Sequence, residues 1–403
     1  MTCGVCTVED TLPKLLCRNR QQWGTNLVAM RKKEYGIWRE YTWNDSYEKV
    51  KAIFLGLTRL GLGAGNGVSI LADNNPEWFW SQLAVQTARG IVIGLNPAGS
   101  MKETKGLMIL SRARFAMAQD QEQVDKLLGM KKDIPSLQKI IYWDGKGLRH
   151  YDNPILISLD ELIRMGEEHE KNHPGDFERR LAHGKGDDIA TLLFTLGAND
   201  SLKLVPATHK FLLSAAEAAL ASNPVHNSDE YVSIISPAWF FEQTLGFCTS
   251  LLAGQRLNFA EKTETAPQDM REISPHALAY PPKLWKVIAK TIQENMADGN
   301  WPKKALYNFS LSLGYKRIHL SQEKRRMGLV GRSLGSIADL LVLRPLRDKH
   351  GFMRARVAYV AGDTLSGEAV EFFSAIGVNL QQIFGSTKGG IVTEPPAADL
   401  KIE

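Results

Sequence analysis

Residues 67–95 read GVSILADNNPEWFWSQLAVQTARGIVIGL, and this stretch decides the fold. Two short apolar runs, residues 68–72 and 91–95, flank a segment that begins at Pro76. Proline is tolerated best in the first turn of a helix, and Gly90 separates the end of the helical pattern from the second apolar run. The pattern predicts two parallel strands joined by a helix in a right-handed crossover.

The same alternation of strands and helices continues on both sides of this stretch. Thr42 is predicted to cap a helix whose apolar residues recur at helical spacing, namely Tyr47, Val50, Phe54 and Leu57. Further strands are predicted at residues 114–118, 139–143, 190–196, 231–235, 256–259, 277–280, 356–361 and 379–384. The chain is therefore predicted to be α/β, with two related sheets that are flanked by helices and packed side by side.

A polar segment separates the two halves of this pattern. Residues 145–188 carry charge runs and are predicted to be a connector with one or two surface helices. We therefore predict a first α/β subdomain with this connector over residues 1–188 and a second α/β subdomain over residues 189–403. Residues 283–350 are predicted to be mostly helical, with a surface rich in lysine and arginine.

The composition is that of an ordinary globular protein. The chain has 403 residues, of which 44% are hydrophobic and 23% are charged, so it can build a sizeable core. Its net charge of +5 is mild and does not favour a nucleic-acid partner. Four cysteines are too few for a disulfide framework, and neither a transmembrane run nor a secretory signal is evident. We expect a cytoplasmic protein, with peripheral membrane contact left open.

Two short patterns could indicate a metal site. His169 and His173 fit the zincin spacing, in which two histidines bind zinc one helical turn apart. However, Pro174 disfavours helix at His173, so a solvated helix end is the preferred interpretation. Cys3 and Cys6 form a C-x-x-C pair, but no second pair follows. We therefore predict no metal ligands from either pattern.

A third pattern concerns hydrolase chemistry. Gly331-Arg332-Ser333-Leu334-Gly335 fits the nucleophile elbow, in which a strained turn after a strand exposes a serine. Only a short apolar segment precedes it, and only His350 lies downstream to serve as a base. A serine hydrolase that uses Ser333 is therefore a remote alternative, and a helix start flanked by glycines is preferred.

The most informative segment is residues 191–213. An apolar strand runs into a polar loop that contains Lys203, and a helix follows. Backbone N–H groups of such a loop, together with an ammonium group, could hold an anion. From the residues alone, an ordinary strand-to-helix connection is an equally good interpretation.

At this segment the chain resembles the adenylate-forming acyl-CoA synthetases, specifically bacterial long-chain fatty-acid CoA ligases. The resemblance covers about residues 7–393, with colinear matches such as DNNPEW (73–78), DQEQVDK (120–126), IYWD (141–144) and LRPLRD (343–348). It implies the large N-terminal domain of that fold, without the C-terminal lid domain. It also implies ATP, Mg²⁺ and coenzyme A as cofactors, and a fatty acid as the substrate.

The family's phosphate loop, T-S-G-T-T-G-x-P-K-G, is only partly retained. Thr195, Gly197 and Lys203 match it, and the resemblance implies that they contact phosphate, with Lys203 as a catalytic residue. Asp200 replaces a glycine and places an anion beside anions, while Leu204 adds bulk. At 4 Å and an effective dielectric constant near 20, each such pair of charges repels by roughly 4 kcal/mol.

The family's second motif, Y-G-x-T-E, reads FGSTK at residues 384–388. The resemblance implies that Phe384 and Gly385 lie at the adenine and that Thr387 meets the phosphate as a catalytic residue. Lys388 stands where the family has a Mg²⁺-binding glutamate, and a cation cannot bind a cation, so the metal site is predicted to be lost. By the same resemblance, Gly362 is assigned to the adenine side and Trp239 to the acyl site, although a core role for Trp239 is an equally good interpretation.

These departures lead to two main functional predictions. The first is a long-chain fatty-acid CoA ligase by descent, AMP-forming, that is inactive or impaired as it stands. The alternative is a non-catalytic pseudo-ligase that binds an acyl chain or a nucleotide. Both predictions place remnants of the nucleotide loops in the second subdomain.

Overall fold

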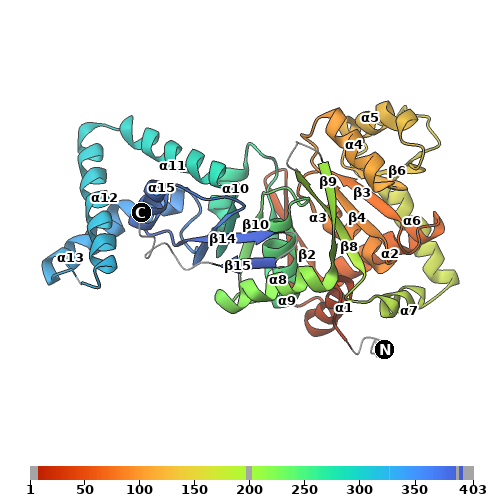
Figure 1. Cartoon of the computed structure of the whole chain (residues 1–403), viewed down its shortest axis with the longest axis horizontal. Coiled ribbons are helices and arrows are strands. Elements are labelled where there is room, and N and C mark those ends of the chain that lie inside the picture. Colours follow the sequence, from red (N-terminus) through yellow and green to blue (C-terminus); the bar gives the residue numbers. More distant parts are fainter. Residues whose placement is uncertain (1–7, 197–201, 326, 387–389, 394–403) are drawn as a thin grey trace. The chain divides into compact units, whose positions relative to one another are not determined.

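The computed structural model describes residues 8–196, 202–325, 327–386 and 390–393 (Figure 1). The chain forms two compact units. Unit 1 comprises Met1–Glu217 and Ile235–Phe259, and unit 2 comprises Ala218–Ile234 and Ala260–Glu403. Helices and strands alternate along the chain and the strands form mixed sheets, which confirms the predicted α/β class. The predicted domain boundary at residues 188/189 coincides with neither change of unit and stays a prediction.

A seven-stranded sheet forms the centre of unit 1, in the order β7-β6-β5-β3-β4-β8-β9. Its strands are β3 (Gly67–Leu71), β4 (Ile91–Leu95), β5 (Phe115–Ala118), β6 (Lys139–Tyr142), β7 (Leu156–Ser158), β8 (Ile189–Leu196) and β9 (Leu202–Thr208). Strands β3 and β4 are parallel, with Gly67 opposite Ile91, so the predicted strand-helix-strand unit is confirmed. Only β9 runs antiparallel, against β8.

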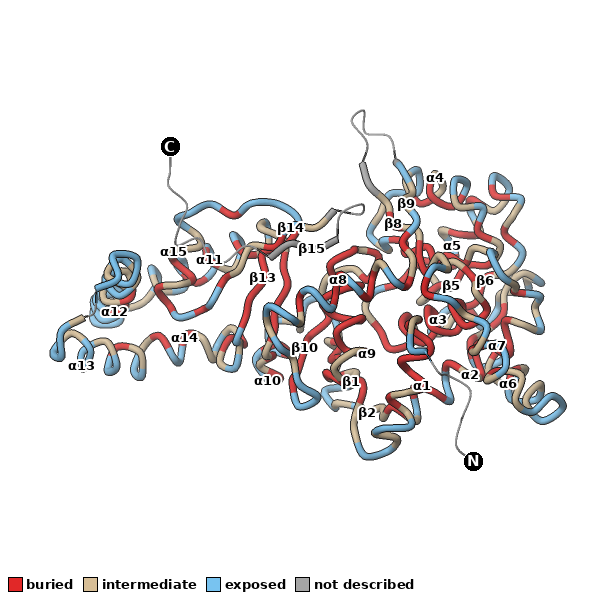
Figure 2. The backbone as a smooth tube through the Cα atoms, turned by 60° about the horizontal axis from the view of Figure 1, so that its bottom comes forward, coloured by how far each residue is buried: buried red, intermediate tan, exposed pale blue. Residues whose placement is uncertain are grey.

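Helices cover both faces of this sheet. They are α2 (Trp43–Arg59), α3 (Pro76–Thr87), α4 (Met101–Ser111) and α5 (Gln121–Met130), with the short 3-10 turn Lys131–Asp133 after α5. Leu107 and Met108 of α4 and Leu127 of α5 pack with Ile93 and Ile140 of the sheet in one buried cluster. Helix α3 connects β3 to β4, and the strand order reverses after β4, so right-handed crossovers place α3 on the opposite face from α4 and α5. Figure 2 shows the buried strands between the more exposed helices.

The N-terminal part of unit 1 contains a hairpin that the sequence patterns did not predict. Helix α1 (Leu12–Trp23) precedes β1 (Val28–Glu34) and β2 (Ile37–Thr42), and β1 also pairs in parallel with β11 (Arg256–Phe259). Tyr35 and Gly36 both have positive φ, as a tight hairpin turn requires. Thr42 then caps α2 as predicted, because its side chain accepts from the Asp45 N–H and the Asp45 side chain accepts from the Thr42 N–H.

The polar connector contains the two predicted helices, α6 (Leu159–Asn172) and α7 (Asp176–His183), together with β7. Helix α6 is more than a surface helix, because it packs closely against α2. A Cβ atom on Gly166 would lie 1.9 Å from the carbonyl oxygen of Ala52, and one on Gly56 would lie 2.2 Å from that of Leu162. The two helix backbones are therefore in direct contact, in antiparallel orientation.

Unit 2 contains five strands in the order β15-β14-β13-β12-β10. They are β10 (Glu230–Ser233), β12 (Ala277–Tyr280), β13 (Val357–Ala361), β14 (Leu380–Ser386) and β15 (Gly390–Thr393), and only β15 runs antiparallel. Its helices are α10 (Ala266–Ile273), α11 (Pro282–Ala297), α12 (Trp301–Gln322), α13 (Leu329–Ala338), the π-helical Asp339–Leu343, α14 (Arg344–Lys349) and α15 (Gly367–Ala375). The predicted helical region at residues 283–350 is thus confirmed.

The remaining helical segments are α8 (His209–Ser222), the π-helical Glu242–Cys248 and α9 (Thr249–Ala253). Among the described residues, no helix is both long enough and apolar enough to cross a bilayer. The predicted cytoplasmic location stays a prediction.

Candidate active site

The lysine of the candidate phosphate loop lies on a strand instead of in a loop. Residues 202–208 form β9, and Lys203 is exposed there, directly opposite Thr195 of β8. The strand pairing therefore brings two of the predicted phosphate residues together. Gly197 lies outside the described residues.

The base of this hairpin is anchored on the N-terminal helix. The side chain of Thr208 accepts a hydrogen bond from the Phe211 N–H at 3.1 Å and so caps the start of α8. His209 is 2% exposed, and its Nδ1 accepts from the Leu12 N–H at 3.3 Å. Burial lowers the pKa of His209 to about 4. The imidazole is therefore neutral at physiological pH and positions the backbone.

Trp239, the predicted acyl-site residue, lies in a segment that forms several hydrogen bonds with the rest of unit 1. The Asn74 side chain donates to the Ile235 carbonyl at 2.6 Å. Gln243 donates to the Pro237 carbonyl at 2.7 Å and exchanges two buried hydrogen bonds with Gln82, at 2.7 and 3.0 Å. Trp239 itself is half-buried and contacts Phe241 edge-on at a centroid distance of 4.9 Å. The π-helix that follows is a geometry often found at functional sites.

A close contact under this segment leads to a first prediction. A Cβ atom on Gly94 would lie 2.7 Å from both Cα and Cβ of Ala238, the neighbour of Trp239. We expect Gly94→Ala to lower the free energy of unfolding by about 1–3 kcal/mol, because the segment must move outward. The measurement is the free energy of unfolding, obtained from denaturant titration of each variant. Gly63→Ala is the control, since its added Cβ would meet only the Asn66 side chain, at 3.9 Å, and an equal loss in both variants would contradict the prediction.

The adenine-side residues lie together in unit 2. Ala361, the last residue of β13, is opposite Ile383 of the parallel strand β14. Gly362 therefore follows the end of β13 beside Phe384, which lies near the carboxyl end of β14. Ligands of open α/β sheets bind at this edge. Gly362 has φ +97°, which favours glycine, and the Gln382 side chain donates to the next carbonyl, that of Asp363, at 2.9 Å.

Phe384 offers an accessible ring at this edge, since it is 37% exposed. Gly385 is opposite Ile391 in the β14–β15 pair. Thr387 and Lys388 lie outside the described residues. The predicted residues thus form two groups, with Thr195, Lys203 and Trp239 in unit 1 and the adenine-side residues in unit 2.

The hydrolase pattern has the wrong local structure. Ser333 lies inside helix α13, and its hydroxyl donates to the Leu329 carbonyl at 3.2 Å. No strand precedes this helix within the described residues 281–325 and 327–328, so the strand-turn-helix geometry of a nucleophile elbow is not formed. The helix start that was the preferred interpretation is therefore supported, and the Ser333 alternative is not carried further.

The histidine pair is a helix end, as preferred. Helix α6 ends at Asn172, so His173 lies beyond it, and His169 contacts Asp176 at 3.2 Å while its ring lies 4.7 Å from that of His173, centroid to centroid. Across the described part of the chain, no group of three or more His, Cys, Asp or Glu side chains could hold a metal ion. Cys3 and Cys6 lie outside it.

Comparison with known proteins identifies the family. The profile described as "AMP-binding enzyme" matches residues 18–401. The chain belongs to the AMP-binding enzyme family. Among curated proteins, the long-chain-fatty-acid–CoA ligase ACSBG1 of Bos taurus is 23% identical over 370 residues, which are 89% of this chain and 49% of that protein. ACSBG2 of Rattus norvegicus is 22% identical over 94% of this chain and 56% of its own length.

Solved structures of the family share the fold. FadD1, a long-chain-fatty-acid–CoA ligase from Archaeoglobus fulgidus, has a TM-score of 0.70 at 14% identity, covering 96% of this chain and 66% of FadD1. The A-PCP didomain of a carboxylic acid reductase from Segniliparus rugosus, in complex with AMP, also has a TM-score of 0.70 at 14% identity, covering 97% of this chain and 54% of that chain. This AMP-binding enzyme chain spans about half the length of the curated relatives it matches, and the resemblance inferred from its sequence is confirmed.

Several residues that support the segment around Trp239 in this AMP-binding enzyme family member carried no local signal in the sequence. Asn74, Gly94 and the Gln82–Gln243 pair act through partners more than 140 positions away. Only a match along the whole chain, or coordinates, could have found them.

Proposed function

We propose that this chain carries the scaffold of an AMP-forming fatty-acyl–CoA ligase and that its own residues support adenylation poorly. The proposal rests on the family membership, on curated relatives that are long-chain-fatty-acid–CoA ligases, and on the changed residues in both nucleotide motifs. The single observation that carries it is the β8–β9 pairing. In this pairing the exposed Lys203 lies opposite Thr195 and follows the predicted phosphate loop, whose small and hydroxyl residues are partly replaced.

In this proposal, different residues of the chain would bind the phosphates, the adenine and the acyl chain. Lys203 would place its ammonium group on a phosphate, and the exposed ring of Phe384 would stack on adenine. Trp239 would line the acyl site. Coenzyme A would enter as the thiol that accepts the acyl group. Stabilisation of the transferring group would be mainly electrostatic, so each lost donor or added anion in the loop raises the barrier.

Mg²⁺, when bound in this family, neutralises phosphate charge. The residues at hand do not fit it well. Lys388 stands in the place of the carboxylate ligand, and Asp363, the carboxylate next to Gly362, accepts a hydrogen bond from the Thr364 N–H at 2.7 Å. We therefore propose no step through a metal ion in this chain.

The test is ATP–pyrophosphate exchange with palmitate, together with calorimetry of ATP binding. We expect exchange near background. We expect Asp200→Gly to tighten ATP binding by at least about tenfold, because it removes an anion from beside the triphosphate, and Lys203→Ala to weaken what binding remains. Asp187→Asn, just before β8, is the matched control that removes an anion outside the loop. Rapid exchange by the unchanged chain would contradict the proposal.

A second candidate is a protein that binds an acyl chain without reacting it. The observation that favours it is an aromatic cluster. The half-buried Trp239 contacts Phe241, and Phe241 also contacts Phe240. Calorimetry with palmitate alone distinguishes the two. Acyl binding that persists in Lys203→Ala, without any exchange activity, supports the binding protein, whereas ATP-dependent adenylate formation supports the ligase.

A further inference from the structure

One segment of unit 2 concentrates exposed apolar side chains. Helices α12 and α13 with the following turn, residues 301–344, are here called the α12–α13 face. Nine of the seventeen large hydrophobic residues that are exposed in the described chain lie on it, with exposures of 41–81%. They are Trp301, Leu306, Phe309, Leu329, Val330, Leu334, Ile337, Leu340 and Leu341. Figure 2 shows most of both helices as exposed. Exposed apolar side chains concentrated on neighbouring helices in this way indicate an interaction site.

The apolar residues of α13 are ordered along one side of the helix. Val330, Leu334, Ile337 and Leu341 follow one another at intervals of four, three and four residues, which is helical spacing. The opposite flank faces a groove of about 790 Å³ between α13 and α12, with Leu313 and Leu320 among its lining residues. The outward stripe is therefore not needed for packing α13 onto unit 2.

The same face is strongly basic. Residues 301–344 contain nine lysines and arginines against two acidic residues, a net charge of +7. The whole chain carries only +5, so the other 359 residues carry −2. Both acidic residues are already paired, Glu323 with Arg325 at 3.2 Å and Asp339 with Arg347 at 2.8 Å.

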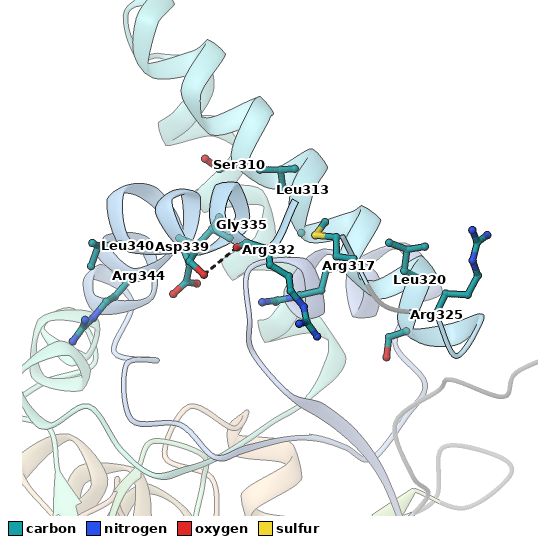
Figure 3. A pocket seen from close by; sticks show the side chains of 15 residues that line it. Ser310, Leu313, Arg317, Leu320, Arg325, Arg332, Gly335, Asp339, Leu340 and Arg344 are labelled. Atoms are coloured by element: carbon teal, nitrogen blue, oxygen red, sulfur yellow. Dashed lines mark hydrogen bonds between the residues drawn. The ribbon is translucent and has the colours of Figure 1, made fainter. Parts of the chain in front are cut away.

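Arginines form the rim of the groove between the two helices. Figure 3 shows Arg317 of α12 and Arg332 of α13 among the residues that line this groove, with Arg344 on the far side of Asp339. The hydrogen bond from Arg347, with Arg317 and Arg344 close by, holds the pKa of Asp339 below its usual range. The arginines thus lie on the groove side of α13, and the apolar stripe lies on its outward side.

We propose that the α12–α13 face docks on the surface of an anionic phospholipid bilayer. Its combination of an apolar stripe on one side with lysines and arginines on the remaining surface is typical of helices that lie in the membrane interface. Trp301, 79% exposed at the start of α12, has the side chain most favoured at that depth. A second copy of the chain is a poor occupant, because two faces of charge +7 repel each other. Nucleic acid would leave the aliphatic stripe without an apolar partner.

The proposal does not depend on ligase activity, so its test measures binding alone. The full chain is sedimented with vesicles of phosphatidylcholine and with vesicles that also contain phosphatidylglycerol. We expect at least about tenfold tighter binding to the anionic vesicles, weakened by added salt.

Two variants separate charge from apolar contact. Joint replacement of Arg317, Arg332 and Arg344 by glutamine is expected to weaken binding on the order of a hundredfold, because each basic residue contributes separately near an anionic surface. Joint replacement of Val330, Leu334 and Ile337 by serine is expected to weaken it by at least about tenfold, since three side chains no longer leave water. Circular dichroism verifies that both variants remain folded.

The matched control is Ile109→Ser with Leu110→Ser on α4, which are 48% and 55% exposed in unit 1. We expect this control to bind like the unchanged chain. Equal binding to both kinds of vesicle, or an equal loss in the control, would overturn the proposal. So would a dimer that forms without lipid and is abolished by the α13 serine variant, because the face would then be a contact between copies of the chain.

Discussion

Replacing Gly166 with alanine is expected to lower the free energy of unfolding of unit 1 by about 3 kcal/mol or more. The new Cβ would lie 1.9 Å from the carbonyl oxygen and 2.8 Å from the carbonyl carbon of Ala52. Neither atom belongs to a flexible side chain, so helices α2 and α6 must move apart. Such a separation also opens the contact one turn away, where Gly56 meets Leu162.

The measurement is chemical unfolding followed by far-ultraviolet circular dichroism. The control is Gly129→Ala in α5, also in unit 1, where the added Cβ would find only the end of the Met101 side chain, at 3.5 Å. This control is expected to be neutral or stabilising by up to about 1 kcal/mol, because alanine favours helix over glycine. A Gly166→Ala variant as stable as this control would show that α6 does not pack against α2 as described.

The α2–α6 contact also illustrates what the sequence could not predict. Helix α2 itself was predictable, because Thr42 and Asp45 form a local capping box and its apolar residues recur at helical spacing. The connector helix was predictable only as a polar surface helix. Its two glycine contacts join positions more than 100 residues apart, and local periodicity contains no information about such partners.

Strands show the same division between local and distant information. Residues 91–95 and 277–280 have the predicted bounds, since each is a compact apolar run that a glycine or a proline adjoins. Residues 202–208 were predicted to belong to the polar loop before the helix, because Lys203 and Pro206 interrupt any apolar pattern. The structure places them as the edge strand β9, and an edge strand tolerates a proline that cannot donate to a neighbour.

The candidate site was predictable by motif and not by geometry. The resemblance named Gly362 and Phe384 separately, and the register of β13 with β14 brings them side by side near the carboxyl ends of the two strands. Carboxyl ends of parallel strands meet at one edge, so this proximity follows once the strands are paired. For Lys203 and Thr195, the antiparallel pairing that joins them had no signal in the sequence.

Replacing Asp229 with alanine is expected to lower the free energy of unfolding of unit 2 by about 2–4 kcal/mol. Asp229 is 1% exposed. Both of its carboxylate oxygens accept from Arg356, Oδ1 from Nη1 at 2.9 Å and Oδ2 from Nη2, and Oδ2 also accepts from the His226 N–H at 2.8 Å. Arg356 immediately precedes β13, and Asp229 immediately precedes β10, so the pair joins the starts of two strands. The loss is smaller than for a fully buried pair, because the guanidinium of Arg356 is 47% exposed and can regain water.

The pH dependence of this loss provides an independent check. Burial alone would raise the pKa of Asp229, but hydrogen bonds from Arg356 and His226 and the nearby charges hold the pKa below its ordinary value of 3.8. A carboxylate with a lowered pKa in the folded state stabilises the protein above the unfolded pKa, and this contribution disappears as pH falls through the folded pKa. The stability difference between the unchanged chain and Asp229→Ala should therefore be constant near neutral pH and shrink below 3.8.

The control for this prediction is Asp348→Ala, which removes a second aspartate–arginine pair of unit 2. Asp348 contacts Arg271 at 3.0 Å, but the two side chains are 49% and 57% exposed. Exposed pairs are screened by solvent, so the loss should be below about 1 kcal/mol. If Asp229→Ala cost no more than this control at neutral pH, burial of Asp229 would not be what fixes β10 and β13.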